Sequence, residues 1–394
     1  MRLLWAIALL IVLAPLVALT ANAGDCGSPT DLHDGWTVTA PENEGLDPTL
    51  ICGIGPRLGA LEDAKAHGIV IARHGRLVYE HYFTGNDWRF GMPLGEVKFD
   101  AGTKHDIRSI SKSVTSLLVG IALDRGLLTD LDAPVFSFFP DYSDVRTPGK
   151  DRITLRHLLT MSSGLAWDET SASFRSPSNI MWQMAAAPRS DRFVLEQPLA
   201  ASPGTVFNYN GGSTDLLGTI LRKLAGKRLD EFAKETLFEP LGIEDWDWDG
   251  CCGFNPTAAS GLRLRPRDLA KIGQLVLERG NWHGHQIVPS SWIEDSTTPR
   301  LSGKGVMFGN PVGITSYGYL WWLGRSPPEH PERDLIAGAG FGGQRLFILP
   351  SLDMVVVITA GLYAEADRDR ANRASAVTDV MMLHRFVFPA AIAH

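Results

Sequence analysis

The chain has 394 residues, of which 44% are hydrophobic and 21% charged, and its formal net charge is -7 at pH 7. This composition is typical of a folded globular protein with one large domain or two interlocked lobes, and it argues against disorder. The acidic balance and the absence of any run of Lys and Arg argue against nucleic acid as a partner.

The first residues have the pattern of an export signal. Arg2 supplies a positive start, residues 3–19 are apolar, and residues 21–23 have the small-x-small cleavage pattern. We therefore expect residues 1–23 to be removed, which makes the mature chain periplasmic or secreted, without a stable membrane span. An uncleaved membrane anchor is the alternative, and Pro15 and the short apolar run weigh against it.

All four cysteines, Cys26, Cys52, Cys251 and Cys252, follow the predicted signal, so they would meet an oxidising compartment. Four cysteines allow three pairings. The adjacent Cys251 and Cys252 would form either a strained vicinal bridge or long-range bridges to the N-terminal cysteines, and the sequence leaves both open. Because no C-x-x-C or H-E-x-x-H pattern occurs, we expect no metal site, and no motif calls for a cofactor.

The first predicted elements are a helix over residues 48–66, broken around residues 53–59, and then two strands. Residues 68–73 and 76–82 alternate apolar and polar around His74 and Gly75, which indicates a β-hairpin. The sequence therefore places strands before the first long helix.

That helix is predicted over residues 111–125, and Ser109 and Lys112 lie at its start. Positions three apart share a helix face, so the lysine amine can reach the serine hydroxyl and take its proton. The positive end of the helix dipole would disfavour the charged lysine, and free N–H groups there could hold an oxyanion. Short S-x-x-K strings also occur by chance on solvated faces, so the string alone does not establish a nucleophile.

The middle of the chain is predicted to be mostly helical, and strands return near its end. Helical spacing is found in residues 155–160, 178–186, 213–225, 229–238 and 262–279. Strand patterns follow in residues 317–323, 346–349 and 354–359, and a final amphipathic stretch covers residues 370–386. We therefore predict a mixed α/β fold, in which helices flank an antiparallel sheet built from both termini and a mostly helical lobe is inserted. Residues 24–394 would form one domain, with a sheet lobe at about 45–105 and 310–394 and a helical lobe at about 106–309.

Two further segments carry potential chemistry. Tyr209 lies in a polar, glycine-containing loop ahead of a predicted helix, where a phenol near a lysine can relay protons, although a packed loop aromatic is the alternative. Residues 338–344 form a glycine run entering a strand, which would let a substrate approach the backbone. A phosphate-binding loop is disfavoured because no Gly-Lys-Ser/Thr follows.

Taken in this order, the three segments resemble the serine β-lactamase and penicillin-binding-protein superfamily, in particular its class-C-related esterase branch. The resemblance covers roughly residues 45–361, and residues 107–113, 158–165 and 342–345 carry its motifs. It implies a β-lactamase/transpeptidase-like fold. It also implies that Ser109 is the nucleophile, Lys112 its base partner and Tyr209 the proton-relaying tyrosine. The backbone N–H groups of Ser109 and Phe341 would then form the oxyanion hole.

The chain departs from this family at two positions. Gly211 lies two residues after Tyr209, where β-lactamases usually have Asn, and residues 337–339 contain no cation where the third motif has Lys or His. A substrate carboxylate would lack its usual anchor, which favours neutral esters or amides. Arg345 is the remaining candidate anchor, and a solvated arginine at a strand edge is the alternative interpretation.

The sequence thus predicts an exported serine hydrolase that cleaves a small ester or amide through an acyl-enzyme on Ser109. The alternatives are a D,D-peptidase or β-lactamase, and a non-catalytic protein that binds cell-wall fragments. A Ser-His-Asp hydrolase is poorly supported because no G-x-S-x-G elbow occurs. The expected partner is a small-molecule substrate. The sequence does not indicate which oligomeric state the protein adopts.

Overall fold

The computed structural model describes residues 26–250, 256–302, 312–326, 328–365 and 367–392, and a nine-stranded sheet organises them. In spatial order the strands are β1 (Thr37–Val38), β3 (Arg76–Tyr82), β2 (Ala66–Arg73), β16 (Met354–Ala360), β15 (Gln344–Leu349), β14 (Leu335–Gly340), β13 (Trp322–Gly324), β12 (Ile314–Tyr317) and β11 (Leu301–Ser302). Only the β1–β3 pair is parallel among these neighbours. The predicted mixed fold, with a sheet drawn from both ends of the chain, is confirmed.

The centre of the sheet joins segments that are far apart in sequence. β2 and β3 form the predicted hairpin, and its two turn residues, His74 and Gly75, have φ of 50° and 72°. Positive φ at both central residues gives a turn whose twist matches that of the strands. On its other side β2 pairs with β16, with Val70 opposite Val357. Both strands are almost entirely buried, so the main core lies around this junction.

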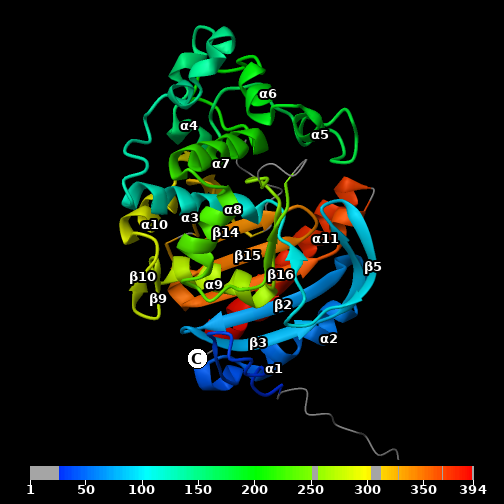
Figure 1. The fold of residues 1–394 in the computed structure, drawn as a ribbon. Helices are drawn as coiled ribbons and strands as arrows, with labels where there is room; N and C mark the ends of the chain where they lie inside the picture. The colour runs from blue at the N-terminus through cyan, green and yellow to red at the C-terminus, as the bar shows by residue number, and fades with distance from the viewer. Residues whose placement is uncertain (1–25, 251–255, 303–311, 327, 366, 393–394) are drawn as a thin grey trace, which may run out of the picture.

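Helices cover the sheet and extend beyond it (Figure 1). They are α1 (Pro48–Cys52), α2 (Ile54–Gly59), α3 (Ile110–Asp124), α4 (Leu155–Leu159), α5 (Ile180–Ala186), α6 (Ser190–Glu196), α7 (Gly211–Ala225), α8 (Leu229–Ala233), α9 (Pro266–Leu277), α10 (Ser290–Ser296), α11 (Arg368–Val380) and α12 (Phe388–Ile392), with π-helical turns at Lys234–Phe238 and Met381–Val387. Figure 1 shows α4 to α7 gathered at one end of the molecule, with α3 between them and the sheet.

Three small sheets complete the fold. One pairs β4 (Thr84–Arg89) with β5 (Met92–Lys98), and another pairs β9 (Asn281–Trp282) with β10 (His285–Gln286). The third has the order β6 (His105–Asp106), β8 (Leu262–Leu264) and β7 (Trp246–Trp248). None of these pairings was predicted. Most of these strands have only two or three residues, and β5 is mostly exposed and contains Pro93 and Gly95, so it lacks an alternating apolar pattern.

The structure corrects four of the predicted elements. The helix predicted over 48–66 is two short helices, because the stretch expected to break it forms α2, and residue 66 already belongs to β2. Residues 262–264 form β8, and the helix starts only at Pro266, because proline fits the first turn of a helix. The strand predicted over 317–323 is a hairpin, in which β12 ends at Tyr317, β13 begins at Trp322 and Leu320 has φ of 63°. The glycine run does not simply enter a strand: Gly338 and Gly340 end β14, and residues 341–343 turn the chain into β15.

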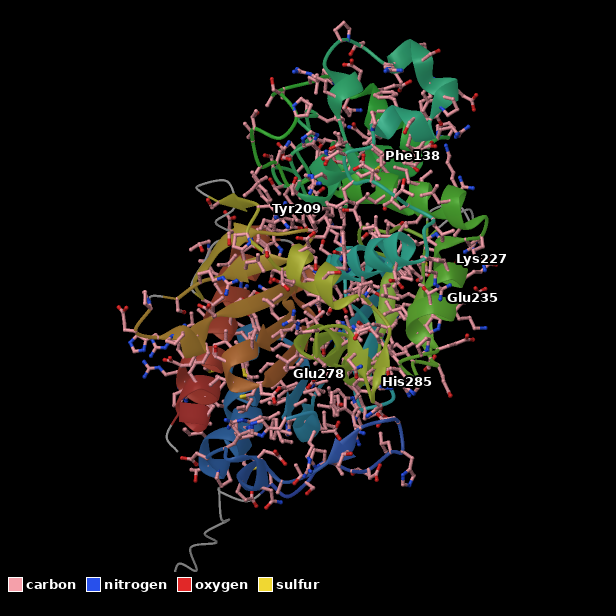
Figure 2. The ribbon with its side chains drawn as sticks, turned by 90° about the vertical axis from the view of Figure 1, so that its left-hand side faces the viewer. Phe138, Tyr209, Lys227, Glu235, Glu278 and His285 are labelled. Carbon is pink, nitrogen blue, oxygen red and sulfur yellow. A yellow bond between two sulfur atoms is a disulfide. The ribbon has the colours of Figure 1, made fainter. Side chains whose placement is uncertain are left out.

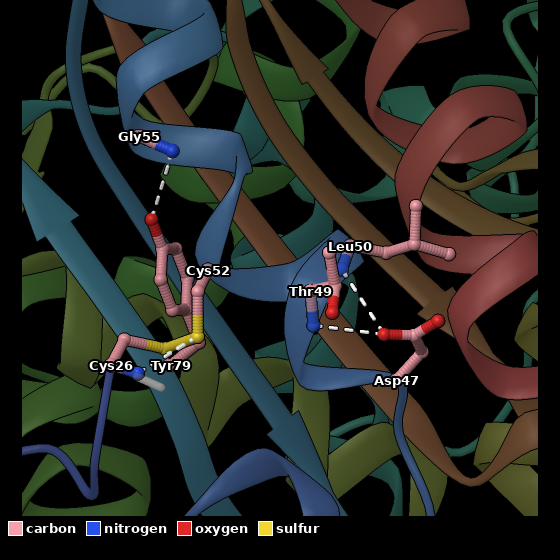
Figure 3. Close-up of a disulfide and its surroundings, with 7 residues drawn as sticks. All are labelled: Cys26, Asp47, Thr49, Leu50, Cys52, Gly55 and Tyr79. Atoms are coloured by element: carbon pink, nitrogen blue, oxygen red, sulfur yellow. Dashed lines mark hydrogen bonds between the residues drawn. A yellow bond between two sulfur atoms is a disulfide. The ribbon is translucent and has the colours of Figure 1, made fainter. Parts of the chain in front are cut away.

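A disulfide ties the N-terminal segment to α1. Cys26 and Cys52 are bonded, and nearby Asp47 caps α1 by accepting hydrogen bonds from the N–H groups of Thr49 (2.8 Å) and Leu50 (3.4 Å) (Figure 3). Cys251 and Cys252 lie outside the described residues, as does the predicted signal at 1–23. Within the described part of the chain, no helix has both the length and the apolar character needed to span a bilayer. The signal and the lobe boundaries stay predictions.

Candidate active site

Ser109 lies at the N-cap of α3, directly after a residue in a sparsely populated backbone conformation. Arg108 has φ of 52°, which is uncommon for a residue with a side chain. Its carbonyl oxygen accepts hydrogen bonds from the N–H (3.0 Å) and the Oγ (2.7 Å) of Ser111, so the turn is held in place. Such strained positions persist where the surrounding structure enforces them and are frequent at functional sites.

The two glycines of β14 let this strand pack directly against the Ser109 turn. A Cβ at Gly340 would lie 2.4 Å from the carbonyl oxygen of Ile107, and one at Gly338 would lie 2.9 Å from Cγ2 of Ile110. From the sequence, these glycines were expected to let a substrate approach the backbone. At Gly338 and Gly340 the space is taken by the chain around the nucleophile candidate instead.

Lys112 is buried beside Ser109, one turn along α3. Its side chain is only 2% exposed, and its Nζ donates hydrogen bonds to Ser109 Oγ at 3.1 Å and to the carbonyl oxygen of Ala259 at 3.0 Å. The same nitrogen lies 4.8 Å from the centre of the Tyr209 ring. The structure therefore brings Ser109, Lys112 and Tyr209 together, as the family resemblance implied.

The charge state of Lys112 differs from the one expected. Burial favours the neutral amine, but Tyr209, Glu169 and Asp215 around it outweigh burial and raise the pKa of Lys112. The expectation that the helix N-terminus leaves Lys112 deprotonated is therefore wrong. The site favours an ammonium that donates to the serine oxygen.

Tyr209 is half-buried in the loop before α7, at the boundary between the helices and the sheet (Figure 2). Its ring stacks on that of Trp322 in β13, with the ring centres 5.6 Å apart. The loop is fixed on both sides of Tyr209. The Asn208 N–H donates to the Met161 carbonyl oxygen at 2.8 Å, and Asn210 caps α7 by accepting from the Ser213 N–H at 2.9 Å.

A cavity of 940 Å³ opens in front of Ser109 and Lys112, and Tyr209 lies behind them rather than in its lining. Ser109, Lys112 and Phe341 line it, together with two carboxyl groups, Glu169 and Asp215. Residues of α5 and its flanking loops form what we call the outer wall, namely Phe174, Arg175, Met181, Trp182, Ala185 and Pro188. The cavity has the size of a typical small-molecule site.

Glu169 explains the glycine at position 211. Its side chain is 2% exposed, and its Oε2 accepts hydrogen bonds from the Gly211 N–H at 2.6 Å and from Trp167 Nε1 at 2.8 Å. A Cβ at Gly211 would lie 3.0 Å from this oxygen and 2.8 Å from Met181 Sδ. The space beside Gly211 thus holds a carboxylate.

Asp215 lies one turn further into α7 and shares a neighbour with Lys112. The Ala259 N–H donates to Asp215 Oδ1 at 3.0 Å, while the Ala259 carbonyl oxygen accepts from Lys112. Burial raises the pKa of Asp215 to about 7, although the Ala259 hydrogen bond and the Lys112 charge oppose this shift. The proton on Asp215 therefore titrates near neutral pH.

Phe341 follows directly after Gly340 and lines the cavity. Its ring packs edge-on against that of Phe174, with centres 5.1 Å apart, and the Arg368 guanidinium lies within 6 Å of both rings. The oxyanion-hole role of the Ser109 and Phe341 N–H groups stays a prediction.

Arg345 is neither a carboxylate anchor nor solvated. It is buried, and its Nε donates to Asp379 Oδ2 at 2.9 Å, with further hydrogen bonds to Ser375 and to the carbonyl oxygen of Gly340. This arginine therefore links β15 to α11, and its charge is already matched by a carboxylate.

One cluster among the described residues has the composition of a metal site. His67, Asp87 and His105 are buried, and their ligand atoms lie within 4.8 Å of one another. His67 Nδ1 and His105 Nε2 are hydrogen-bonded to each other at 2.8 Å, and Asp87 Oδ2 accepts from Arg263 at 3.2 Å. Because these groups satisfy one another and do not line the cavity, we interpret them as a buried polar network.

The sequence pattern of the beta-lactamase family matches residues 59–379, which is most of the chain. The chain belongs to the beta-lactamase family.

Similar proteins agree with this assignment. The chain is 24% identical over 312 residues to the 6-aminohexanoate-dimer hydrolase of Paenarthrobacter ureafaciens, which covers 75% of this chain and 73% of the relative. It is 30% identical to the lovastatin esterase of Penicillium rubens over 198 residues, or 44% of this chain and 46% of the relative. The octameric penicillin-binding protein homologue from Pyrococcus abyssi has the same fold, with a TM-score of 0.62 at 22% identity over 84% of this chain and 77% of that one. A beta-lactamase-family hydrolase is thus supported.

Sequence reasoning missed Glu169, Asp215 and the Ala259 carbonyl oxygen. Asp215 carried a signal, because Asp215, Thr219 and Arg222 have the spacing of one polar face on the predicted helix, and all three line the cavity. Glu169 lies in a loop whose conformation the sequence does not specify. Ala259 contributes only backbone atoms, and a residue pattern does not predict where backbone atoms will lie.

Proposed function

We propose that this protein is a serine hydrolase that cleaves a small, uncharged ester or amide through an acyl-enzyme on Ser109. The observation that carries the proposal is the 3.1 Å hydrogen bond from buried Lys112 to Ser109 Oγ, at the wall of a 940 Å³ cavity. The proposal includes export to the periplasm or beyond after cleavage behind Ala23, which rests on the sequence of residues 1–23.

In the proposed acylation step, Ser109 Oγ bonds to the substrate carbonyl carbon as its proton passes to Tyr209. Lys112, as an ammonium, holds the serine oxygen, and its positive charge beside the Tyr209 ring would stabilise the phenolate that this step requires. The carbonyl oxygen becomes an oxyanion near the Ser109 and Phe341 N–H groups. Tyr209 then protonates the leaving group as its bond to carbon breaks. Water repeats the sequence and releases the acid.

The preference for uncharged substrates rests on what surrounds Ser109. Residues 337–339 supply no cation, and Arg345 is engaged with Asp379. A D,D-peptidase or β-lactamase activity is the second candidate, because the chain shares its fold with a penicillin-binding protein homologue. A binding protein without turnover would not need a buried lysine in contact with both a serine hydroxyl and a tyrosine ring.

The test is Ser109→Ala in the purified mature protein, assayed with p-nitrophenyl acetate and butyrate, short amides and nitrocefin. We expect losses of about 10⁴-fold or more on every substrate that the wild type cleaves. Mass spectrometry should find the acyl group on the peptide containing Ser109.

Ser116→Ala is the matched control, because Ser116 is on the same helix and its buried hydroxyl has no hydrogen-bond partner among the described residues. A Ser109→Ala protein that keeps a tenth of the wild-type activity contradicts the proposal. Nitrocefin as the best substrate would favour the β-lactamase alternative.

A further inference from the structure

Glu169 is a buried carboxylate that faces the substrate cavity without an ion-pair partner. Within the described part of the chain, no Lys, Arg or His nitrogen lies within 4.0 Å of its carboxylate oxygens, although its side chain is only 2% exposed. Arg368 comes near, but it donates to the backbone oxygen of Glu169 at 3.5 Å rather than to the carboxylate. Lys112 and Arg368 interact with it only at longer range. A buried carboxylate without a direct ion-pair partner is costly, so its presence beside a nucleophile candidate suggests a function.

The carboxylate is also held rigidly. The Gly211 N–H and Trp167 Nε1 both donate to Oε2, at 2.6 and 2.8 Å, and neither donor carries a charge. The absent side chain at Gly211 leaves the room for it. Because Gly211 is two residues from Tyr209, this fixed negative charge lies at the reacting end of the cavity, where it also acts on Lys112.

The other charges of the cavity do not cancel it. Arg108 and Arg189 are paired with Asp106 and Asp191, at 3.1 and 3.3 Å. Arg175 lies against the Trp88 ring, 4.0 Å from its centre, and Arg222 is two turns along α7 from Asp215. Near Ser109 the Lys112 ammonium therefore faces two carboxyl groups, Glu169 and Asp215.

We infer that Glu169 determines substrate specificity by favouring neutral and cationic substrates over those with a carboxylate near the scissile bond. The inference rests on the proposed hydrolase function. It adds Glu169 as a specificity-determining residue and names the charge of the preferred substrates. In a cavity walled by protein, where the effective dielectric constant is lower than in bulk water, a fixed charge acts on substrate charges several ångströms away. A substrate carboxylate is repelled by Glu169, and a substrate ammonium is attracted.

The test is Glu169→Gln, assayed with three phenyl acetates that share one acyl group. These are methyl 4-acetoxybenzoate (neutral), 4-acetoxybenzoate (anionic) and 3-acetoxy-N,N,N-trimethylanilinium (cationic). Gln keeps an oxygen that accepts from Gly211 and Trp167 while the charge is lost. We expect kcat/KM for the anionic ester, relative to the neutral one, to rise about 5- to 30-fold over the wild-type ratio. The cationic-to-neutral ratio should fall by a similar factor.

Glu294→Gln is the matched control, because it removes the same charge at an exposed residue that does not line the cavity, where Arg279 lies 3.0 Å away. Its ratios should stay within about twofold of wild type. An active Glu169→Gln protein with unchanged ratios, or equal shifts in both variants, overturns the inference and leaves the hydrolase function standing. Wild-type protein that cleaves none of the esters overturns both.

Should Glu169→Gln fail to fold, the wild-type protein decides. Its rates on the three esters, each divided by the rate of uncatalysed hydrolysis, should be highest for the cationic or neutral ester and lowest for the anionic one. The anionic ester ranking first overturns the inference.

Discussion

The corner around Ser109 and the outer wall of the cavity are built in different ways. At the corner, β14 and the segment around Ala259 meet the start of α3 through close backbone contacts, and Lys112 is almost fully buried. The outer wall is a seven-residue helix and its flanking loops, and Trp182 there is 44% exposed. The side chains proposed to react are therefore held by the packing of the sheet, whereas the outer wall, which we propose faces the substrate, can change without disturbing them.

Among the substitutions that compare the two regions, Tyr209→Phe at the corner should have the largest effect on activity. Phe keeps the ring that stacks on Trp322 but removes the proton relay, so kcat should fall roughly 10²- to 10⁴-fold on esters and amides alike. The melting temperature should be unchanged, which separates chemistry from folding. An unchanged kcat would return Tyr209 to a packing role.

Asp215→Asn tests whether the ionisation of Asp215 changes kcat/KM. The pKa of Asp215 is raised to about 7, so the wild-type profile of kcat/KM against pH should include an ionisation near 7 that Asp215→Asn lacks. Asp191→Asn on α6 is the control and should keep it. A wild-type ionisation near pH 7 that survives in Asp215→Asn would assign it to another group.

The same substitution has a stability signature with a defined sign. Between about pH 4 and 7 the folded protein keeps a proton on Asp215 that the unfolded chain has released. The stability that Asp215 contributes is therefore fully present below pH 4 and is lost as the pH rises to 7. The free energy of unfolding of wild type, relative to Asp215→Asn, should fall over this range in urea denaturation.

Trp182→Ala probes the outer wall and should have the smallest effect. It removes apolar surface that a long acyl chain would contact, so kcat/KM for p-nitrophenyl octanoate should fall about three- to tenfold. The rate on p-nitrophenyl acetate should stay within about twofold, and Trp182→Phe should restore most of the loss. Equal losses on both esters would mean that the wall and the corner are not independent.

The sequence predicted the corner better than the wall for a physical reason. Ser109 and Lys112 are one helical turn apart, so their contact follows from local geometry. The sheet was predictable because hydrophobic alternation identified β2, β3 and β16. The position of Glu169 depends on Gly211 and Trp167 and on a loop packed against Arg368, and such long-range contacts leave no periodic signal. The charge of Lys112 was mispredicted because it depends on Glu169 and Asp215, which no local pattern in the sequence places beside Lys112.

The pairing of β2 with β16 has a consequence for when the protein becomes active. β14, β15 and β16 are synthesised long after α3, yet β14 packs on the Ser109 turn and β16 completes the centre of the sheet. A growing chain therefore holds Ser109 and Lys112 long before the surroundings that fix them exist. Folding must await long-range strand pairing, which is slow, so the proposed nucleophile is not assembled until β14 to β16 have been made.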